Sequence, residues 1–509
     1  MSNRRGNFFS KIRKVSLFAA VFAMVFSLTG CSSKSGTATG KYTLYWWRTL
    51  GDAPEETLQE IATNYMSDNP GITIKVVTKD PRTYQEEALS ALAAYQTVEN
   101  APDILSVDAE DLPRLAPQLS TAPDDLFDTS VQKNQKKGEK TLQYVKALFV
   151  PSVVNSTVLN DPAGVQKVYG LPMGVDNLAL YINQDLIQKA LEALQSSQTS
   201  QKTISPEQMS ALKKKIQTPP KTWNDLAAIV PYLTVKNGSQ ITQSAIAIGT
   251  SKNVERSYDI LAAIMMQNGT QITSDDLNSV AFNQARATAA QSVNSGEEAL
   301  KFYLRFSSES DPLYTWNDKM PNSVTAFEQG QVAMMIQYAD AYRFIIKEMP
   351  SIKNSIDVQP LPQVADPSSP SSADSQKTIA KMWVETAPSA RGDANRQRAA
   401  WNFIYYLTNK SASSTYLSTM KLPSALKDGS DRSKFEAFST QKNIADTWYK
   451  GSKAMNVNEI FIGMIDNAYT KKKSTKEALD SAATDITTIL QASKVKRATA
   501  QTGATGATK

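Results

Sequence analysis

The sequence contains no histidine, and Cys31 is its single cysteine. Without histidine the chain cannot form a Ser-His-Asp or Cys-His catalytic set, a histidine zinc site or an HExxH metalloprotease motif. Without a second cysteine it cannot form an internal disulfide. It also lacks a GxxxxGK[ST] phosphate-binding loop, and we expect neither a metal site nor a cofactor. These absences exclude most nucleophilic and metal-dependent classes of enzyme.

A strong excess of charge of one sign is also missing from most of the chain. The sequence holds 55 Lys and Arg and 49 Asp and Glu, a formal charge of +6. Five of the positive residues and none of the negative ones lie in residues 1–30, so the remainder carries only +1. Binding to the phosphates of a nucleic acid needs a clustered basic surface. We therefore expect no nucleic-acid partner.

The N-terminal segment has the organisation of an export signal. Basic residues precede an apolar run at 15–28, which is shorter than the roughly 20 residues that span a bilayer and suits a signal peptide. The run ends in Leu28-Thr29-Gly30-Cys31. Small residues before such a cysteine resemble a bacterial lipoprotein signal, in which the cysteine is acylated and the chain is cut before it. We expect a signal peptide at 1–30, a lipid anchor on Cys31, a tether at 31–40 and a place on the extracytoplasmic face of the cell membrane.

The next segment alternates strand-like and helix-like patterns. Strand-like runs at 42–47, 72–76 and 102–106 flank helix-like segments at 58–66 and 83–95. This β-α-β-α-β order predicts a parallel sheet covered by helices. Ligands bind such sheets at the carboxyl ends of the strands. The candidate binding residues at those ends are Trp47, Arg48, Asp108 and Glu110.

Five segments further along carry distinctive motifs. They are a YGLP turn and apolar strand at 169–186, PPKTWNDL at 219–226, AFEQGQVAMM at 326–335, VQPLP at 358–362 and AAWNFI at 399–404. In this order they resemble the extracellular solute-binding proteins of family 1, which include the maltose-binding protein of sugar importers. Within the second segment, Thr222 is expected to cap a helix and Trp223 to anchor its packing.

The resemblance implies an α/β fold of two lobes, each a mainly parallel sheet flanked by helices, joined by crossing hinge strands with the ligand between them. The implied lobe one covers 41–174 plus 377–421, and lobe two covers 175–362 plus 422–492. Residues 363–376 are rich in Pro and Ser and are expected to form a surface loop, and the tail at 493–509 is expected to be disordered.

The resemblance also supplies ligand-binding candidates beyond the first sheet. Asp176 matches the position of a sugar-contacting acid, and Asn177 is its neighbour. Tyr338 and Asp340 follow the AFEQGQVAMM segment at a family ligand position, and Trp383 and Asn458 come from later segments. Maltose binders carry aromatic residues where this chain has Val107, Asp340 and Asn458-Glu459, which argues against a maltodextrin as the solute.

The implied function is that of an importer receptor: a monomer that captures a mono- or oligosaccharide and delivers it to ABC permease subunits in the membrane. Three alternatives stay open. Arg48 and Arg82 near strand ends would suit a non-sugar or anionic solute. Asp108, Glu110 and Asp176 could serve a surface glycoside hydrolase, which needs two carboxylates. The Arg391-Gly392-Asp393 triplet is the one feature that would suit an adhesin.

Overall fold

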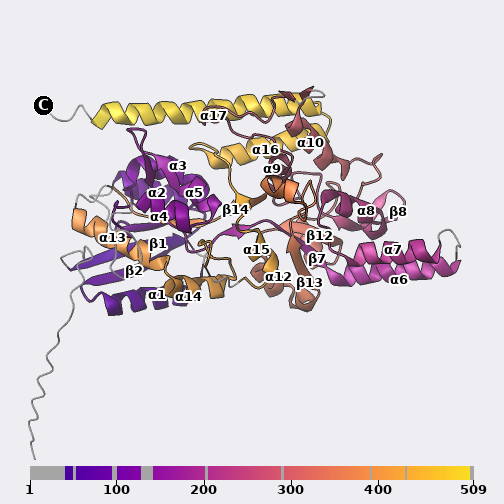
Figure 1. Cartoon of the computed structure of the whole chain (residues 1–509), viewed down its shortest axis with the longest axis horizontal. Coiled ribbons are helices and arrows are strands. Elements are labelled where there is room, and N and C mark those ends of the chain that lie inside the picture. Colours follow the sequence, from indigo (N-terminus) through magenta and orange to yellow (C-terminus); the bar gives the residue numbers. More distant parts are fainter. Residues whose placement is uncertain are drawn as a thin grey trace, which may run out of the picture.

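The computed structural model shows two α/β lobes lying side by side, with crossing strands between them (Figure 1). It describes residues 41–49, 53–94, 100–127, 141–200, 205–287, 292–389, 393–429 and 433–504. The expected signal peptide, Cys31 and the tether lie outside the described residues, as do Arg391 and Gly392 of the RGD triplet. In the described part of the chain, no helix has the length and apolar character needed to cross a membrane.

Lobe one is built on a four-stranded sheet of order β15-β3-β1-β2. Its strands are β1 (Tyr42–Thr49), β2 (Ile72–Lys79), β3 (Ile104–Asp108) and β15 (Trp383–Thr386). The first three strands are parallel, as the β-α-β-α-β pattern predicts, and β15 returns antiparallel beside β3. The helices that cover this sheet include α1 (Glu55–Asp68), α2 (Tyr84–Ala93), α13 (Ala394–Leu407) and α14 (Lys410–Met420).

Aromatic packing joins these helices to the sheet. Trp46 of β1 is fully buried and meets Phe403 of α13 edge-on, with ring centroids 5.1 Å apart. Tyr65 of α1 also packs edge-on against Phe403, at 4.9 Å. Such edge-to-face pairs add roughly 0.5–1.5 kcal/mol each beyond the burial of their apolar area.

Lobe two has a five-stranded sheet of order β13-β7-β12-β9-β8. The strands are β7 (Ala179–Asn183), β8 (Val235–Asn237), β9 (Gln240–Ile246), β12 (Val332–Gln337) and β13 (Ile356–Pro360). Only β9 and β12 pair in parallel, so this sheet is mixed and not mainly parallel as expected. The reason is that β7 runs away from the hinge, whereas its neighbours β12 and β13 both run back toward it.

The hinge is a small sheet of its own, of order β16-β14-β6. It consists of β6 (Asp176–Asn177), β14 (Thr378–Lys381) and β16 (Ala445–Asp446). Bridges from Leu171 to Glu385 and from Gly174 to Ser424 continue this pairing into lobe one. Two of the crossing segments approach so closely that a side chain on Gly170 would overlap Val384 Cγ1 and lie 2.8 Å from the Glu385 carbonyl oxygen.

Helices surround the lobe-two sheet and extend beyond it. The hairpin of α6 (Gln184–Ser200) and α7 (Pro206–Gln217) projects from the far end of the lobe (Figure 1). The others are α8 (Trp223–Leu233), α9 (Ser257–Gln267), α10 (Ser295–Arg305), α11 (Ser323–Glu328), α12 (Ala341–Glu348), α15 (Glu436–Gln441), α16 (Ala454–Tyr469) and α17 (Thr475–Ala504).

Two local predictions can be compared with these helices. The cap of α8 is confirmed, because Thr222 Oγ1 accepts from the Asp225 N–H at 3.0 Å and the Asp225 carboxylate accepts from the Thr222 N–H. Trp223 is buried and donates to Gln267 Oε1 at 2.7 Å. The tail prediction differs from the structure, because α17 continues to Ala504, into the segment expected to be disordered. The residues from Ala492 to Ala504 include no proline, so the helical backbone pattern continues uninterrupted.

Short elements complete lobe one on the side that faces lobe two. They are η1 (Ala109–Asp111), α3 (Leu112–Leu115), η2 (Ala116–Gln118), α4 (Thr141–Leu148), α5 (Pro151–Thr157), β4 (Val158–Asn160) and β5 (Gln166–Val168). Elsewhere β10 (Arg286–Ala287) pairs with β11 (Ser292–Val293), and η3 (Pro350–Asn354) precedes β13. The expected loop at 363–376 holds only the short helix η4 (Pro370–Ser375).

Candidate functional site

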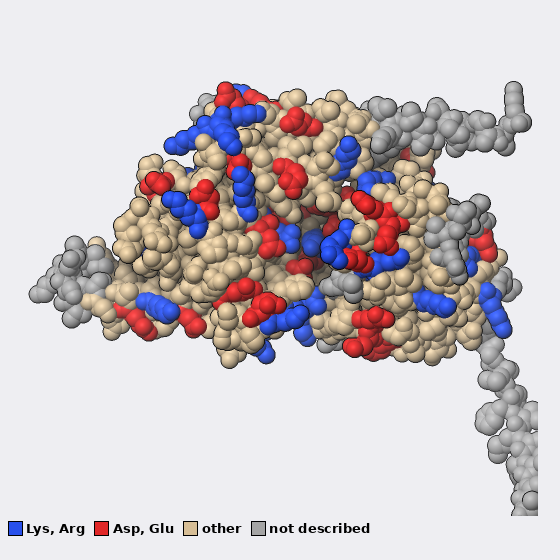
Figure 2. All heavy atoms as spheres, turned by 180° about the vertical axis from the view of Figure 1, so that it is seen from behind, with Lys and Arg blue, Asp and Glu red and all other residues tan. Residues whose placement is uncertain are grey.

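A cavity of about 570 Å³ lies between the two lobes. This volume is within the range of roughly 300–1,000 Å³ that is usual for small-molecule sites. Figure 2 shows Lys, Arg, Asp and Glu side chains gathered around the hollow between the two halves of the molecule. Lobe one supplies one wall, lobe two supplies the other, and the hinge strand β14 contributes Ala380 and Lys381.

The lobe-one wall is formed where β3 ends. Asp108 is the last residue of β3, and its Oδ1 accepts from the N–H of Glu110 at 3.0 Å, which starts the short helix η1. The Ala109 N–H donates to the Met382 carbonyl at 3.1 Å and fixes this turn against the hinge. Asn155 and Ser156 of α5 extend the wall. The expected placement of Asp108 and Glu110 at a strand's carboxyl end is confirmed.

The lobe-two wall comes from several segments that are distant in sequence. The first turn of α9 contributes Tyr258 and Asp259, preceded by Arg256. Tyr338 follows the end of β12, and Asn458 lies in α16. The segment between β16 and α16 adds the residues Thr447, Trp448, Tyr449 and Lys450. Of these, only Tyr338 and Asn458 are among the sequence-based candidates.

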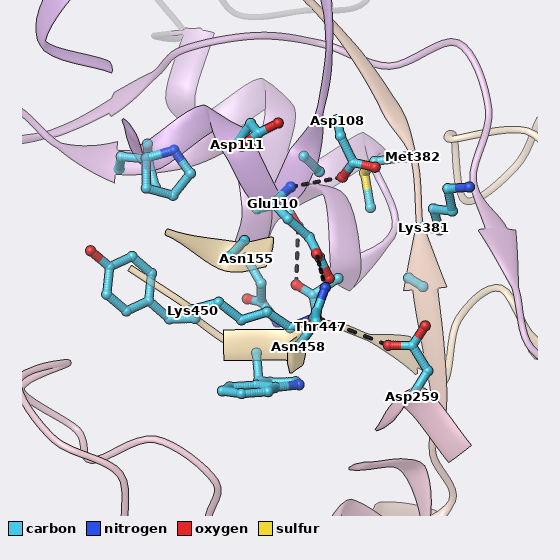
Figure 3. Close-up of a pocket in the computed structure, with 18 of the residues that line it drawn as sticks. Asp108, Glu110, Asp111, Asn155, Asp259, Lys381, Met382, Thr447, Lys450 and Asn458 are labelled. Atoms are coloured by element: carbon cyan, nitrogen blue, oxygen red, sulfur yellow. Dashed lines mark hydrogen bonds and ion pairs between the residues drawn. The ribbon is translucent and has the colours of Figure 1, made fainter. Parts of the chain in front are cut away.

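A chain of polar contacts crosses the cavity from one lobe to the other (Figure 3). Lys450 forms an ion pair with the Glu110 carboxylate, and Asn458 Nδ2 donates to the same carboxylate at 3.3 Å. Lys450 Nζ also lies 4.0 Å from Asp259 Oδ1, and the Tyr338 hydroxyl donates to Asp259 Oδ2 at 2.9 Å. Glu110 of lobe one is therefore tied to four residues of lobe two, two of them directly and two through Lys450.

The carboxyl groups of this site differ in their pKa values. Burial, and next the charge of Glu110, raises the pKa of Asp108 to about 7. Burial also acts to raise the pKa of Glu110, but Lys450 and the hydrogen bonds from Lys450 and Asn458 outweigh it and lower that pKa. Burial raises the pKa of Asp259 against the opposing effect of Lys450. Asp108 can therefore both donate and accept a hydrogen bond near neutral pH, whereas Glu110 only accepts.

Aromatic rings lie beside the cations of the same wall. Lys450 Nζ is 5.2 Å from the ring centre of Trp448 and 5.5 Å from that of Tyr258. The guanidinium of Arg256 lies 5.3 Å from the ring centre of Tyr338. These distances are within the range of cation–π attraction. The cavity thus combines charged groups that can read hydroxyls with rings that can pack against an apolar face.

Arg48 does not reach this cavity, contrary to expectation. It is fully buried, forms an ion pair with Glu385 of β15 and lies 5.5 Å from the ring centre of Tyr416. The reason is strand alternation, because Arg48 falls on the same face of β1 as Trp46, which is covered by helices. Trp47 is also outside the cavity lining: its Nε1 donates to the Asn100 carbonyl at 3.2 Å, and Lys79 Nζ lies 3.9 Å from its ring centre.

Asp176 and Asn177 are engaged within the hinge and do not line the cavity. Asp176 accepts from the N–H groups of Ala339 and Asp340 at 2.8 and 3.1 Å, and it is buried. Asn177 is fully buried and donates to the Phe438 carbonyl at 2.9 Å. These contacts fasten the first crossing to the end of β12 and to α15.

Asp340 and Trp383 are likewise outside the cavity lining. Asp340 Oδ2 lies 3.7 Å from Lys381 Nζ at the hinge, and Trp383 pairs in β15 opposite Asp108. Arg82 is exposed and paired with Asp80 on the surface. Of the ten candidate residues, the structure brings four together at the cavity: Asp108, Glu110, Tyr338 and Asn458. In the part of the chain that the structure describes, no cluster of three or more possible metal ligands is found.

The residues that sequence reasoning missed lack a local motif. Lys450 lies in an aromatic and polar run, Trp448-Tyr449-Lys450, which gave the only available signal. Arg256 and Tyr258 lie at the start of the apolar helix α9, and no feature of the sequence sets them apart. Their partners are distant in sequence: Lys450 is 340 residues from Glu110.

Comparison with known proteins identifies the family to which the chain belongs. The sequence profile described as "Bacterial extracellular solute-binding protein" matches residues 51–413, which is more than half of the chain. The chain belongs to this family. The family is described as one of extracellular proteins that bind solutes. No curated protein matches the chain in sequence.

Solved structures of other solute-binding proteins share the two-lobe fold. The cyclic alpha-maltosyl-1,6-maltose binding protein of Arthrobacter globiformis has a TM-score of 0.64 at 15% identity, covering 89% of this chain and 100% of its own. The sugar-binding protein MalE of Xanthomonas citri has a TM-score of 0.62 at 18% identity, covering 88% and 97%. UgpB of Mycobacterium tuberculosis, in complex with glycerophosphocholine, has a TM-score of 0.60 at 14% identity, covering 89% and 99%.

Proposed function

We propose that this solute-binding protein captures a carbohydrate, a mono- or oligosaccharide, in the cavity between its lobes. The observation that carries the proposal is the balance of charge in the cavity lining. The lining holds as many acids as bases, namely Asp108, Glu110, Asp111 and Asp259 against Lys146, Arg256, Lys381 and Lys450. This mixture of acidic and basic side chains has no large excess of either sign, even when Asp108 is protonated, and it suits a neutral solute whose many hydroxyls accept from the cations and donate to the carboxylates.

Aromatic side chains support the same solute class. Tyr258, Tyr338 and Trp448 all line the cavity, and a sugar ring presents an apolar face that packs on such rings. Two of the structures that share the fold are named as sugar-binding proteins. Arg48 and Arg82, the two residues that favoured an anionic solute, lie outside the cavity lining.

The cellular role follows from the sequence. Export, acylation of Cys31 and residence on the extracytoplasmic face of the membrane would place the cavity next to ABC permease subunits that receive the solute. The protein would act as a monomer and without catalysis. Loss of labelled fatty acid incorporation in a Cys31→Ala variant tests the anchor, and undiminished incorporation would contradict it.

A second candidate is a zwitterionic solute. Its positive and negative groups could pair with the acidic lobe-one turn and with Lys381 and Arg256 across the cavity. A protein of the same fold has been solved with glycerophosphocholine. Opposite charges on facing walls are what this candidate requires, whereas a purely anionic solute would meet as many acids as bases.

A thermal-shift screen separates these candidates. The purified protein is heated with a panel of mono- and oligosaccharides, with sugar phosphates and with glycerophosphocholine. A solute that binds only the folded state raises its stability by RT ln(1 + [L]/Kd), about 2.7 kcal/mol at 100 times Kd. We expect a neutral sugar to raise the melting temperature, and Glu110→Gln to diminish the effect. A rise in melting temperature with charged solutes only would contradict the carbohydrate proposal. If the protein released shorter sugars from an oligosaccharide during incubation, it would be a hydrolase.

A further inference from the structure

Two large apolar side chains that line the cavity are strongly exposed to solvent. Leu277 is 41% exposed and Met455 is 63% exposed, and both line the cavity. Large exposed apolar side chains are few among the described residues, and single ones are ordinary on a protein surface. Two of them at the rim of one binding cavity make a contact surface that the binding of a hydroxyl-rich solute inside the cavity does not explain.

The backbone of Leu277 is held in an unfavourable conformation. Its φ is +58°, in the left-handed region that a leucine rarely adopts. The turn that imposes this angle is closed by three hydrogen bonds: Leu277 N–H to the Ser274 carbonyl at 2.9 Å, Ser274 N–H to the Ser279 carbonyl at 2.9 Å and Asn278 N–H to Asp276 Oδ1 at 3.1 Å. Strain of this kind persists where the surrounding structure imposes it, and it gathers at ligand contacts.

The same turn is fastened to the segment that carries the site. The Thr273 hydroxyl donates to the Tyr449 carbonyl at 3.2 Å, one residue before Lys450. On the other side, the Val280 N–H donates to Thr487 Oγ1 at 3.3 Å. Leu277 is therefore positioned with respect to Lys450 by a fixed frame.

Met455 belongs to the same region of the rim. It lies in the first turn of α16, three residues before Asn458, and residues three apart lie on one face of a helix. Asn458 of that face donates to Glu110 inside the cavity. Met455 is therefore the next side chain outward from the polar contacts, and its unbranched thioether adapts to surfaces of varied shape.

We propose that Leu277 and Met455 form an apolar lip that packs against the part of a sugar chain projecting from the cavity, so that the protein prefers an oligosaccharide to the monosaccharide. This inference rests on the proposed carbohydrate function. The charged and polar groups of the cavity hold the first unit through its hydroxyls, and the lip covers the C–H face of the next one. Contact between the lip and this second sugar unit removes water from both apolar surfaces and stabilises the complex. A monosaccharide is too short to make this contact.

The test compares sugar lengths on lip variants. Leu277→Asn keeps a residue that tolerates the left-handed conformation but removes the apolar surface, and Met455→Gln removes it on α16 with similar length. Calorimetry measures binding of glucose, maltose and maltotriose, and of mannose and mannotriose. We expect each variant to weaken oligosaccharide binding about 3- to 10-fold and monosaccharide binding less than twofold, with the wild type binding the oligosaccharides more tightly.

Val235→Gln is the matched control, because Val235 is 50% exposed but lies on β8, outside the cavity lining. It is expected to leave every dissociation constant unchanged. Equal losses of affinity for short and long sugars, or no loss of affinity, would contradict the proposed role of the lip. A lowered melting temperature of Leu277→Asn with unchanged affinities would show a structural role for Leu277 and overturn it too. If no sugar of the thermal-shift panel binds the wild type, the carbohydrate function itself fails.

Discussion

Asp108 and Glu110 are two residues apart, but their surroundings give their carboxyl groups different tasks. Burial raises the pKa of Asp108 to about 7, whereas Lys450 holds the pKa of Glu110 below its ordinary value. One group can therefore donate to a sugar oxygen, and the other offers charged acceptor atoms. The pairing of a neutral and an ionised carboxyl follows from position and not from residue type.

The raised pKa of Asp108 predicts a pH-dependent contribution to stability. The group titrates near 3.9 in the unfolded chain and at about 7 in the folded one. Between these values the folded state holds a proton that the unfolded state has lost, so this contribution falls as the pH rises. Asp108→Asn lacks the titration. The melting temperature of this variant should therefore rise relative to that of the wild type as the pH increases from 4.5 to 8. Differential scanning fluorimetry measures both melting temperatures. Parallel curves would contradict the shift.

A substitution at Asp176 tests whether this residue stabilises the hinge or binds the solute. Its carboxylate accepts from two backbone N–H groups of residues 339 and 340, which Asp176→Ala would leave without that partner. We expect the free energy of unfolding in urea to fall by about 1–3 kcal/mol. Sugar affinity should change less than twofold, because Asp176 does not line the cavity. A tenfold loss of affinity with unchanged stability would restore Asp176 to the binding site.

At the scale of elements, the glycine of the YGLP turn lies where two crossing segments approach each other too closely for a side chain. Gly170→Ala would place a methyl group against Val384 and the backbone of Glu385, so the hinge must shift. We expect a loss of about 1–3 kcal/mol in the free energy of unfolding.

Gly463→Ala is the matched control, because Gly463 lies in α16 with no atom within 4 Å of the added group. It should raise stability by about 0.5–1 kcal/mol, since alanine favours the helix. A neutral Gly170→Ala would contradict the close approach.

Patterns within one element were the most predictable from sequence. The alternation of β1, β2 and β3 with α1 and α2, and the cap at Thr222, depend on neighbours a few residues away. The burial of Arg48 depends on its ion pair with Glu385, 337 residues along the chain, and no local pattern reveals that partner. The mixed pairing of the lobe-two sheet depends in the same way on where the chain re-enters the hinge.

At the scale of the whole molecule, the site exists only where both lobes meet. Asp108 and Glu110 were predictable because strand ends in parallel sheets bind ligands, and Tyr338 and Asn458 came from the family resemblance. Lys450 and Asp259 were not, because their role depends on contact with the opposite lobe.

The ion pair of Glu110 and Lys450 predicts coupling across the cleft. Either Glu110→Gln or Lys450→Met should weaken sugar binding about tenfold. The first leaves the buried Lys450 without its nearest carboxylate, and the second leaves the half-buried Glu110 without its cation. The double variant should lose less than the sum of both losses, with a coupling free energy of about 1–3 kcal/mol. Calorimetry on the four proteins measures this cycle. Strictly additive losses would show that the two residues act separately.

The central claim is that a sugar binds between the lobes and closes them around itself. A ligand that makes contacts only in the closed form shifts the population toward it by its differential affinity. Small-angle X-ray scattering of the protein, with and without a saturating amount of the sugar found in the thermal-shift screen, measures this directly. We expect a smaller radius of gyration with the sugar. An unchanged scattering profile at saturation would contradict it.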